Sequence, residues 1–262
     1  MRAMILAAGL GTRLRPLTDN RPKALVEVGG RTLLEITLSR LRAFGVSEVI
    51  INVHHFADMV IDYLKTNKNF GMRIEVSREE VLLDTGGGLK KAGWFFLDDS
   101  IHDDSTRIDE PFLLHNVDII STIDLARTLQ FHSENHALAT LAVQHRETSR
   151  YLLFDDQLRL CGRRAGPGSS QALDQKPEIV RASQPPESLQ ALAFSGIHVI
   201  SPRLLPMLTE DGVFSIIPSY LRLAAHGETI LAFRADDYYW RDLGRPADLT
   251  QVANDLQQHV LP

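Results

Sequence analysis

The densest chemistry in the sequence lies within its first 25 residues. An apolar run over residues 3–7 is followed by Gly9 and Gly11, and then by cationic side chains at positions 13, 15, 21 and 23. Glycine lets backbone N–H groups approach an anion, arginine presents a planar fork of donors to phosphate oxygens, and lysine adds a mobile point charge. The pattern favours a phosphate-binding loop over a solvated basic turn, because the cations directly follow a buried strand.

Two common phosphate loops do not fit this segment. Residues 9–14, GLGTRL, lack the third glycine of the dinucleotide-binding fingerprint. No G-x-x-x-x-G-K-[ST] run occurs in the chain either. A phosphate site here would therefore have to be built in another way.

The composition is that of an ordinary globular protein. The 262 residues are 44% hydrophobic and 23% charged, and a chain of this length can bury a sizeable core. The net charge is −5. This acidic balance argues against nonspecific nucleic-acid binding, and no run approaches the roughly 20 apolar residues that span a bilayer. The single cysteine, Cys161, can form neither an internal disulfide nor a thiolate metal site alone. We therefore expect a cytoplasmic protein that binds neither nucleic acid nor membrane.

Strand-like and helix-like segments alternate in the first half of the chain. The predicted strands cover residues 3–7, 48–53, 72–77, 111–118 and 137–143, and the predicted helices cover 32–44, 57–67 and 123–134. This order is typical of a Rossmann-like three-layer α/β fold, in which a mixed, mostly parallel sheet has helices on both faces. Ligands of such sheets bind at the carboxyl ends of strands, where both the opening loop and residues 115–118 lie.

The second half is predicted to fold over the edge of the first, within a single domain of residues 1–262. Strands are expected at 150–154, 158–161, 191–200, 229–234 and 238–241, and helices at 203–208, 215–226 and 246–257. The polar stretch 162–188 is either an ordered excursion or a mobile loop, and we expect partial mobility. The acids at 98, 99, 103 and 104 indicate a solvated loop.

The opening segment resembles the signature of the sugar-1-phosphate nucleotidyltransferases. Residues 6–30, LAAGLGTRLRPLTDNRPKALVEVGG, are similar to the family pattern L-A-A-G-x-G-T-R-L-x-P-L-T, with a P-K-x-L element behind it. Later segments also resemble the family, namely 82–92 (LLDTGGGLKKA), 112–118 (FLLHNVD), 194–202 (FSGIHVISP) and 238–249 (YYWRDLGRPADL). Within the family, the chain most resembles the N-acetylmuramic acid 1-phosphate uridylyltransferases and the related mannose-1-phosphate guanylyltransferase-like proteins.

The resemblance implies a nucleotide-diphospho-sugar transferase fold with a role for each half of the chain. Residues 1–145 would form the nucleotide-binding half, and residues 146–262 the sugar-binding half and C-terminal helix. The residues expected to bind the nucleotide are Ala7, Ala8, Gly9, Gly11, Thr12, Arg13, Gly86 and Gly87. The expected catalytic residues are Arg13 and Lys23, the expected Mg²⁺ ligands are Asp118 and Asp242, and the candidate sugar-binding residues are Asn116, Arg150, Ser195 and Gly196. Sequence spacing does not show that the two aspartates meet.

The implied reaction suits these residue types. An oxygen of a sugar 1-phosphate attacks the α-phosphorus of a nucleoside triphosphate in line, and pyrophosphate leaves. Because the nucleophile is already an anion, the site must supply positioning and charge neutralisation rather than a general base. Mg²⁺ prefers oxygen ligands and is typically bound by one or two carboxylates plus substrate phosphates, which matches a pair of aspartates.

Two segments depart from the family pattern. Val117 stands where the family usually has the glycine of N-G-D, and its side chain either narrows the sugar pocket or points into the sheet, of which we expect the second. The V-E-K-P element that many members carry has no clear counterpart, since Gln175-Lys176-Pro177 is the nearest string and its context is polar. The sequence identifies neither the base nor the sugar, and it leaves the oligomeric state unknown.

Two other functions are compatible with such a sheet. Metal-dependent glycosyltransferases usually present a D-x-D pair, whereas Asn116-Val117-Asp118 offers one acid. A non-catalytic sensor or regulatory subunit of the same fold tends to lose the loop arginine, the lysine or a metal acid. All four are present here as Arg13, Lys23, Asp118 and Asp242, which favours the enzyme.

Overall fold

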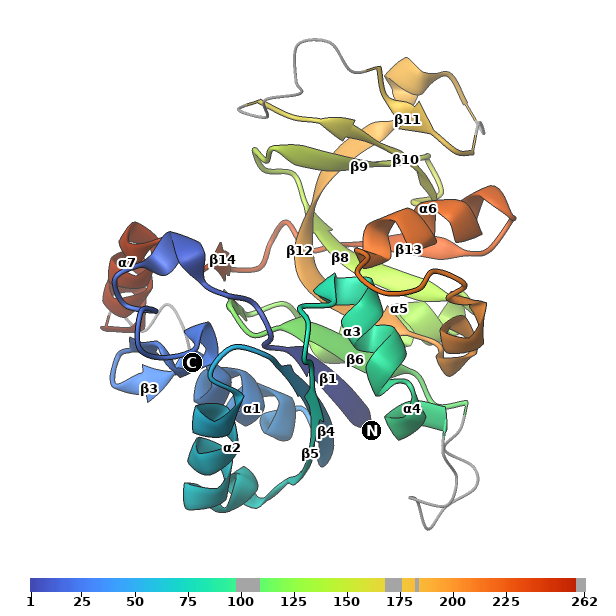
Figure 1. The fold of residues 1–262 in the computed structure, drawn as a ribbon. Helices are drawn as coiled ribbons and strands as arrows, with labels where there is room; N and C mark the ends of the chain where they lie inside the picture. The colour runs from blue at the N-terminus through green and yellow to red at the C-terminus, as the bar shows by residue number, and fades with distance from the viewer. Residues whose placement is uncertain (98–108, 168–175, 182–183, 258–262) are drawn as a thin grey trace.

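Four parallel strands form the part of the sheet that positions the opening loop (Figure 1). β1 (Arg2–Leu6) lies between β4 (Glu48–Val53) and β6 (Phe112–Asn116), and β5 (Arg73–Arg78) flanks β4. Every residue of β4 is buried, as expected for a parallel strand that is covered on both faces. This computed structural model describes residues 1–97, 109–167, 176–181 and 184–257.

Antiparallel strands extend this sheet into the second half of the chain. β12 (Gln190–Ile200) pairs antiparallel with β6, with β8 (Ala139–Gln144) and with β9 (Arg150–Phe154). The order of the sheet is β11-β10-β9-β12-β6-β1-β4-β5, and β8 joins β12 to the parallel strand β13 (Ile230–Arg234). Both halves therefore share one mixed sheet, with ten strands in the described ranges, which confirms the predicted fold class.

Helices cover both faces of the sheet. The helices on one face are α1 (Leu33–Ala43), α2 (Ala57–Thr66) and α5 (Leu125–Glu134), and those on the other are α3 (Asp84–Ala92), α4 (Trp94–Leu97) and α6 (Ile216–Ala225). Each face has its own buried hydrophobic cluster, so the architecture has three layers. None of the helices in the described ranges is both long and apolar enough to cross a membrane.

Local signals account for the predicted boundaries of α1. The Thr32 hydroxyl accepts a hydrogen bond from the backbone N–H of Glu35 at 3.1 Å, which satisfies one free donor of the first turn. After the helix, Gly45 has a φ of 94°, a left-handed conformation that glycine adopts without steric cost. The helix therefore ends within one residue of the predicted boundary at residue 44.

A small second sheet joins distant parts of the chain. β7 (Ile119–Ser121) follows directly after β6, and β14 (Trp240–Asp242) pairs with it antiparallel. In this register Asp242 lies opposite Ile119. The segment after β14 leads into α7 (Pro246–Gln257), which begins with a proline, as predicted.

Part of the polar stretch 162–188 follows the ordered alternative. Residues 162–165 belong to β10 (Leu160–Ala165), which pairs with β11 (Glu178–Ile179), so parts of the polar stretch 162–188 are regular strands. Residues 168–175 and 182–183 of that stretch, and the acidic run at 98–104, lie outside the described residues. The other short elements are β2 (Glu27–Val28), β3 (Arg31–Thr32), η1 (Thr12–Leu14), η2 (Lys23–Leu25), η3 (Lys68–Gly71), η6 (Pro186–Ser188) and η7 (Pro202–Met207).

The three glycines of the T-G-G-G segment lie inside α3, where propensity disfavours them. Close packing explains their presence. A Cβ at Gly87 would lie 2.4 Å from the carbonyl oxygen of Gly212, and one at Gly88 would lie 2.8 Å from Asn52 and from Glu79. The glycines therefore let α3 approach neighbouring groups more closely than any side chain would allow.

We expect Gly87→Ala to destabilise the fold by about 1–3 kcal/mol, because the new methyl group meets a backbone oxygen that has little room to move. Urea unfolding measures the difference. Gly9→Ala is the matched control, since nothing lies within 4 Å of a Cβ there, and we expect a change within about 0.5 kcal/mol. Equal stability of the two variants would contradict the packing role of Gly87.

Candidate active site

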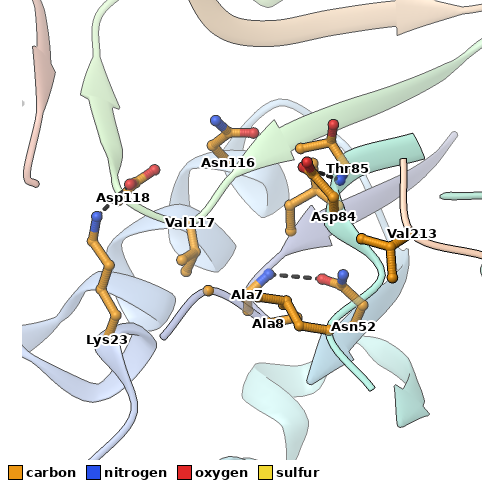
Figure 2. A pocket seen from close by; sticks show the side chains of 13 residues that line it. Ala7, Ala8, Lys23, Asn52, Asp84, Thr85, Asn116, Val117, Asp118 and Val213 are labelled. Atoms are coloured by element: carbon orange, nitrogen blue, oxygen red, sulfur yellow. Dashed lines mark hydrogen bonds and ion pairs between the residues drawn. The ribbon is translucent and has the colours of Figure 1, made fainter. Parts of the chain in front are cut away.

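A cavity of about 440 Å³ opens at the carboxyl ends of β1, β4 and β6 (Figure 2). Its volume lies in the range of small-molecule sites. Six of the predicted site residues line it, namely Ala7, Ala8, Gly9, Lys23, Asn116 and Asp118. The other lining residues are Leu6, Asn52, Leu82, Asp84, Thr85, Val117 and Val213. The cavity therefore lies where ligands of open α/β sheets bind.

A chain of buried hydrogen bonds holds the two walls of this cavity. The Ala7 N–H donates to Asn52 Oδ1 at 2.8 Å, and Asn52 Nδ2 donates to Glu79 Oε1 at 2.7 Å. The second oxygen of Glu79 accepts from the Leu83 N–H at 2.9 Å, just before α3. Asn52 and Glu79 were not predicted, although Asn52 is the one amide within the apolar run of β4.

Lys23 and Asp118 form an ion pair at the carboxyl end of the sheet (Figure 2). Lys23 is buried to all but 7% of its surface and comes from η2, whereas Asp118 follows β6. A buried ammonium group needs such a partner, because an unpaired charge in this position would be costly. The lysine therefore neutralises one of the two predicted metal ligands.

Asp242 lies beside Asp118. The strand pairing places Asp242 opposite Ile119, and the Leu243 N–H donates to the Asp118 carbonyl oxygen at 2.8 Å. Burial raises the pKa of the Asp242 carboxyl above its usual value, and the negative charge of Asp118 raises it further, while Lys23 and Arg13 oppose the shift. The structure thus brings together the two carboxylates whose proximity spacing alone did not show.

These carboxylates suit a hard divalent cation. Asp242 Oδ1 is buried and has no hydrogen-bond partner among the described residues, so it is an unused acceptor. Across all the described residues, no group of three or more His, Cys, Asp or Glu side chains could hold a metal. A cation held by Asp118 and Asp242 would therefore take its remaining ligands from substrate oxygens or water, as Mg²⁺ commonly does.

Arg13 lies near Asp242, and its positive charge acts on that carboxyl from the opening loop. Its guanidinium packs against Gly244, where a Cβ would lie 2.7 Å from Nη2 of Arg13 and 3.0 Å from Asp242 Oδ1. Gly11 has a φ of 65°, and a Cβ there would lie 2.9 Å from Thr18, so glycine is needed at this turn. Gly11, Thr12 and Arg13 do not line the cavity itself, and their predicted contact with the triphosphate stays a prediction.

Gly86 and Gly87 are buried in the first turn of α3 and do not line the cavity either. The Gly86 N–H donates to the Phe214 carbonyl oxygen at 2.9 Å. Their neighbours Asp84 and Thr85 line the cavity instead. The glycines thus have a packing role, and their contact with the base stays a prediction.

Of the candidate sugar-binding residues, Asn116, Ser195 and Gly196 are buried or half-buried, whereas Arg150 lies on the surface. Gly196 has a φ of 72°, and a Cβ there would lie 3.0 Å from Asn116 Nδ2, so glycine lets β12 approach Asn116 closely. Ser195 is fully buried, and its hydroxyl has no partner among the described side chains and backbone groups. Arg150 is exposed at the start of β9. Within the described residues its side chain makes no hydrogen bond or ion pair with the other candidate sugar-binding residues.

Arg146, which was not predicted, lies on this side of the site. Its guanidinium lies 3.6 Å from the centre of the Trp240 ring and donates to the Phe194 carbonyl oxygen at 2.7 Å. Burial lowers the pKa of Arg146, and the negative charge of Asp242 opposes that shift. No motif marks Arg146 in the sequence, because its position depends on Trp240 from the opposite end of the chain.

Val117 combines both alternatives that the sequence left open. It is 4% exposed and packs in the hydrophobic cluster on the α1 face, and it also lines the cavity. The departure from glycine is therefore accommodated mainly by the core, as expected, while part of the side chain forms the cavity wall.

The chain belongs to the nucleotidyl transferase family, whose profile matches residues 2–259. It is 32% identical over 253 residues to an N-acetylmuramate alpha-1-phosphate uridylyltransferase from Caulobacter vibrioides, with 93% of this chain and 92% of that protein covered. It is 30% identical to a mannose-1-phosphate guanyltransferase from Yarrowia lipolytica, with 95% of this chain but only 62% of that protein covered. Its fold is also similar to that of a putative glucose-1-phosphate thymidylyltransferase from Bacillus anthracis, at a TM-score of 0.75 and 16% identity over 100% of this chain and 97% of that one.

The two aspartates should affect stability with opposite signs. Asp242→Asn should raise the free energy of unfolding at neutral pH, because it removes a charge that burial disfavours. Since the folded-state pKa of Asp242 is raised, this gain exists above that pKa and disappears as the pH falls through it. Urea unfolding over a pH series measures the effect.

Asp118→Asn is the matched comparison. It should lower the free energy of unfolding by about 1–3 kcal/mol, because it leaves the buried Lys23 ammonium without its partner. A loss of stability in both variants at neutral pH would contradict the charge balance described here.

Proposed function

We propose that this protein transfers a nucleotidyl group from a nucleoside triphosphate to a sugar 1-phosphate and releases pyrophosphate. The observation that carries the proposal is the meeting of Lys23 and Arg13 with Asp118 and Asp242 beside a cavity at the carboxyl end of the sheet. Family membership supports it, as do the activities named for the relatives from Caulobacter vibrioides and Yarrowia lipolytica.

In this proposal Ala7, Ala8 and Gly9 contact the nucleotide in the cavity that they line. A sugar-phosphate oxygen forms a bond to the α-phosphorus, and the bond from that phosphorus to the bridging oxygen breaks, so the electron pair leaves with pyrophosphate. No group has to remove a proton, because the attacking oxygen is an anion. Arg13 stabilises the charge that develops on pyrophosphate, and Lys23 draws the reacting phosphates together.

Asp118 and Asp242 would hold a Mg²⁺ ion, which supplies positive charge to the phosphate oxygens when it is bound. The buried Asp242 Oδ1, which has no hydrogen-bond partner in the part of the chain that the structure describes, supports this assignment. Lys23 would leave Asp118 for the phosphates as the nucleotide binds. In this proposal Lys23 pairs with Asp118 in the absence of substrate and with the phosphates in its presence.

The relatives point to UTP or GTP as the nucleotide and to N-acetylmuramate 1-phosphate or mannose 1-phosphate as the acceptor. We place the protein in nucleotide-sugar synthesis in the cytoplasm, where its single, buried Cys161 would stay reduced. A panel of nucleoside triphosphates and sugar 1-phosphates with Mg²⁺, read out as pyrophosphate release, identifies the pair. Nucleotide binding without release from any pair would support a sensor instead.

With that pair, Arg13→Ala and Lys23→Ala should each lower kcat by about 10²–10³-fold, as expected for removal of a preorganised electrostatic group. Pyrophosphate release measures the loss. Arg15→Ala is the matched control, because Arg15 is exposed and pairs only with Asp19 among the described residues. A similar loss in all three variants would contradict specific roles for Arg13 and Lys23.

We propose further that Arg146 contacts the phosphate of the sugar 1-phosphate, since it is a cation that stacks on Trp240 of β14 and interacts with the charge of Asp242 on the same strand. Arg146→Ala should raise the KM for the sugar 1-phosphate about 10–100-fold and leave nucleotide affinity unchanged, because a charged hydrogen bond contributes about 1.5–3 kcal/mol. Arg150→Ala is both the control and the test of the sequence-based candidate. A larger effect at Arg150 would overturn this assignment.

A further inference from the structure

A second cavity, of about 850 Å³, lies on the α1 face of the molecule. Residues of α1, of β7 and of the turn between β2 and β3 form its walls, together with Ala253 of α7. It shares no lining residue with the cavity at the candidate active site. Its walls are largely apolar, with contributions from Ile36, Phe44, Ile120 and Leu125.

Arg40 gives this cavity a positive charge that has no acidic partner within the described residues. Its guanidinium donates to the Ser121 hydroxyl and to the Ile123 carbonyl oxygen, and both partners are uncharged. No carboxylate in the described part of the chain forms an ion pair with it, in contrast to Arg31 at the same cavity, which pairs with Glu35. Burial lowers the pKa of Arg40 to about 10, so it keeps its charge at neutral pH.

His115 adds an unused hydrogen-bond acceptor to the same cavity. The ring is 1% exposed, and its Nδ1 lies 2.8 Å from the Asn116 carbonyl oxygen. A carbonyl oxygen only accepts, so Nδ1 carries the hydrogen, and the neutral ring has a bare lone pair on Nε2. Burial lowers the pKa of His115 to about 3, and the Arg40 charge contributes to this shift. Nε2 has no partner among the described residues.

These groups define the chemistry of a ligand. An anionic group would neutralise Arg40, an N–H or O–H group would donate to His115 Nε2, and an apolar body would cover the isoleucine, leucine and phenylalanine side chains. We propose that the cavity is a second binding site, which takes a small organic acid with an apolar body and a hydrogen-bond donor, and that its occupancy changes nucleotide affinity. The effect on nucleotide affinity rests on the proposed function.

The cavity and the candidate active site share two structural elements. β7 lines the cavity with Ile119, Ile120 and Ser121, and the same strand pairs with β14, which carries Asp242. His115 lies three residues before Asp118 on the segment that ends β6. A ligand that shifts β7 or His115 would therefore shift both carboxylates, and by linkage the nucleotide would change the affinity for that ligand by the same factor.

Anilinonaphthalene sulfonate is a suitable probe, because it combines an anionic sulfonate, an N–H group and two aromatic ring systems. We expect saturable binding to the full chain, measured by dye fluorescence, and we expect saturation to persist when the nucleotide and Mg²⁺ are in excess. Arg40→Gln should weaken dye binding about tenfold, as for loss of a charged hydrogen bond. Arg42→Gln is the matched control on the same helix, since Arg42 does not line the cavity.

Ile36→Trp tests the site without removing a hydrogen bond, because it fills the cavity from α1. It should also weaken dye binding about tenfold, with circular dichroism as the check on folding. Unchanged dye affinity in a folded Ile36→Trp protein, or competitive displacement of the dye by nucleotide, would overturn the second site.

Isothermal titration of the nucleotide with and without dye tests the coupling. A shift in nucleotide affinity that is lost in Ile36→Trp supports regulation, and identical affinities would overturn it. The dye titration needs no turnover, so failure of the pyrophosphate assay would remove the proposed reaction without affecting the evidence for the second cavity.

Discussion

The pairing of β7 with β14 is the constraint on which the site depends. The two strands come from positions about 120 residues apart, and three residues on each side form the ladder. Without it, Asp242 would have no fixed position relative to Asp118, and Gly244 would not bring the backbone against Arg13. A short piece of antiparallel sheet at the edge of the structure therefore assembles groups from both ends of the chain.

The two cations and two carboxylates gathered there balance in number, but the two carboxylates differ in how well they are stabilised. Lys23 is paired with Asp118, whereas the buried Asp242 has a raised pKa and one oxygen without a hydrogen-bond partner in the described ranges. Such an arrangement lowers the stability of the protein alone and favours anything that brings positive charge to the carboxylates. Functional sites commonly retain this kind of local cost, because the groups are held ready for a ligand rather than for one another.

The fold could be predicted from the sequence where local patterns and tertiary structure agree. The β-branched run of β4 and the capped α1 are examples, since burial and capping are both visible in the sequence. Prediction failed for α3, because its glycines are poor helix formers and are there for contacts with Phe214 and Gly212, which come from far along the chain. It was also incomplete for β10 and β11, whose polar edge residues give little periodic signal.

The opening loop and Asp118 were visible as a motif, whereas Asn52, Glu79, Arg146 and Arg40 contribute only through partners distant in sequence.

The buried amide of Asn52 has a mechanical consequence. It joins the turn after β1 to the acid that anchors the start of α3, and Gly88 lets that helix sit directly on the pair. These hydrogen bonds thus tie the turn after β1 to the start of α3 across the cavity. A ligand that enters the cavity has to fit this spacing, because moving the two sides apart would break the hydrogen bonds that Asn52 makes to each of them.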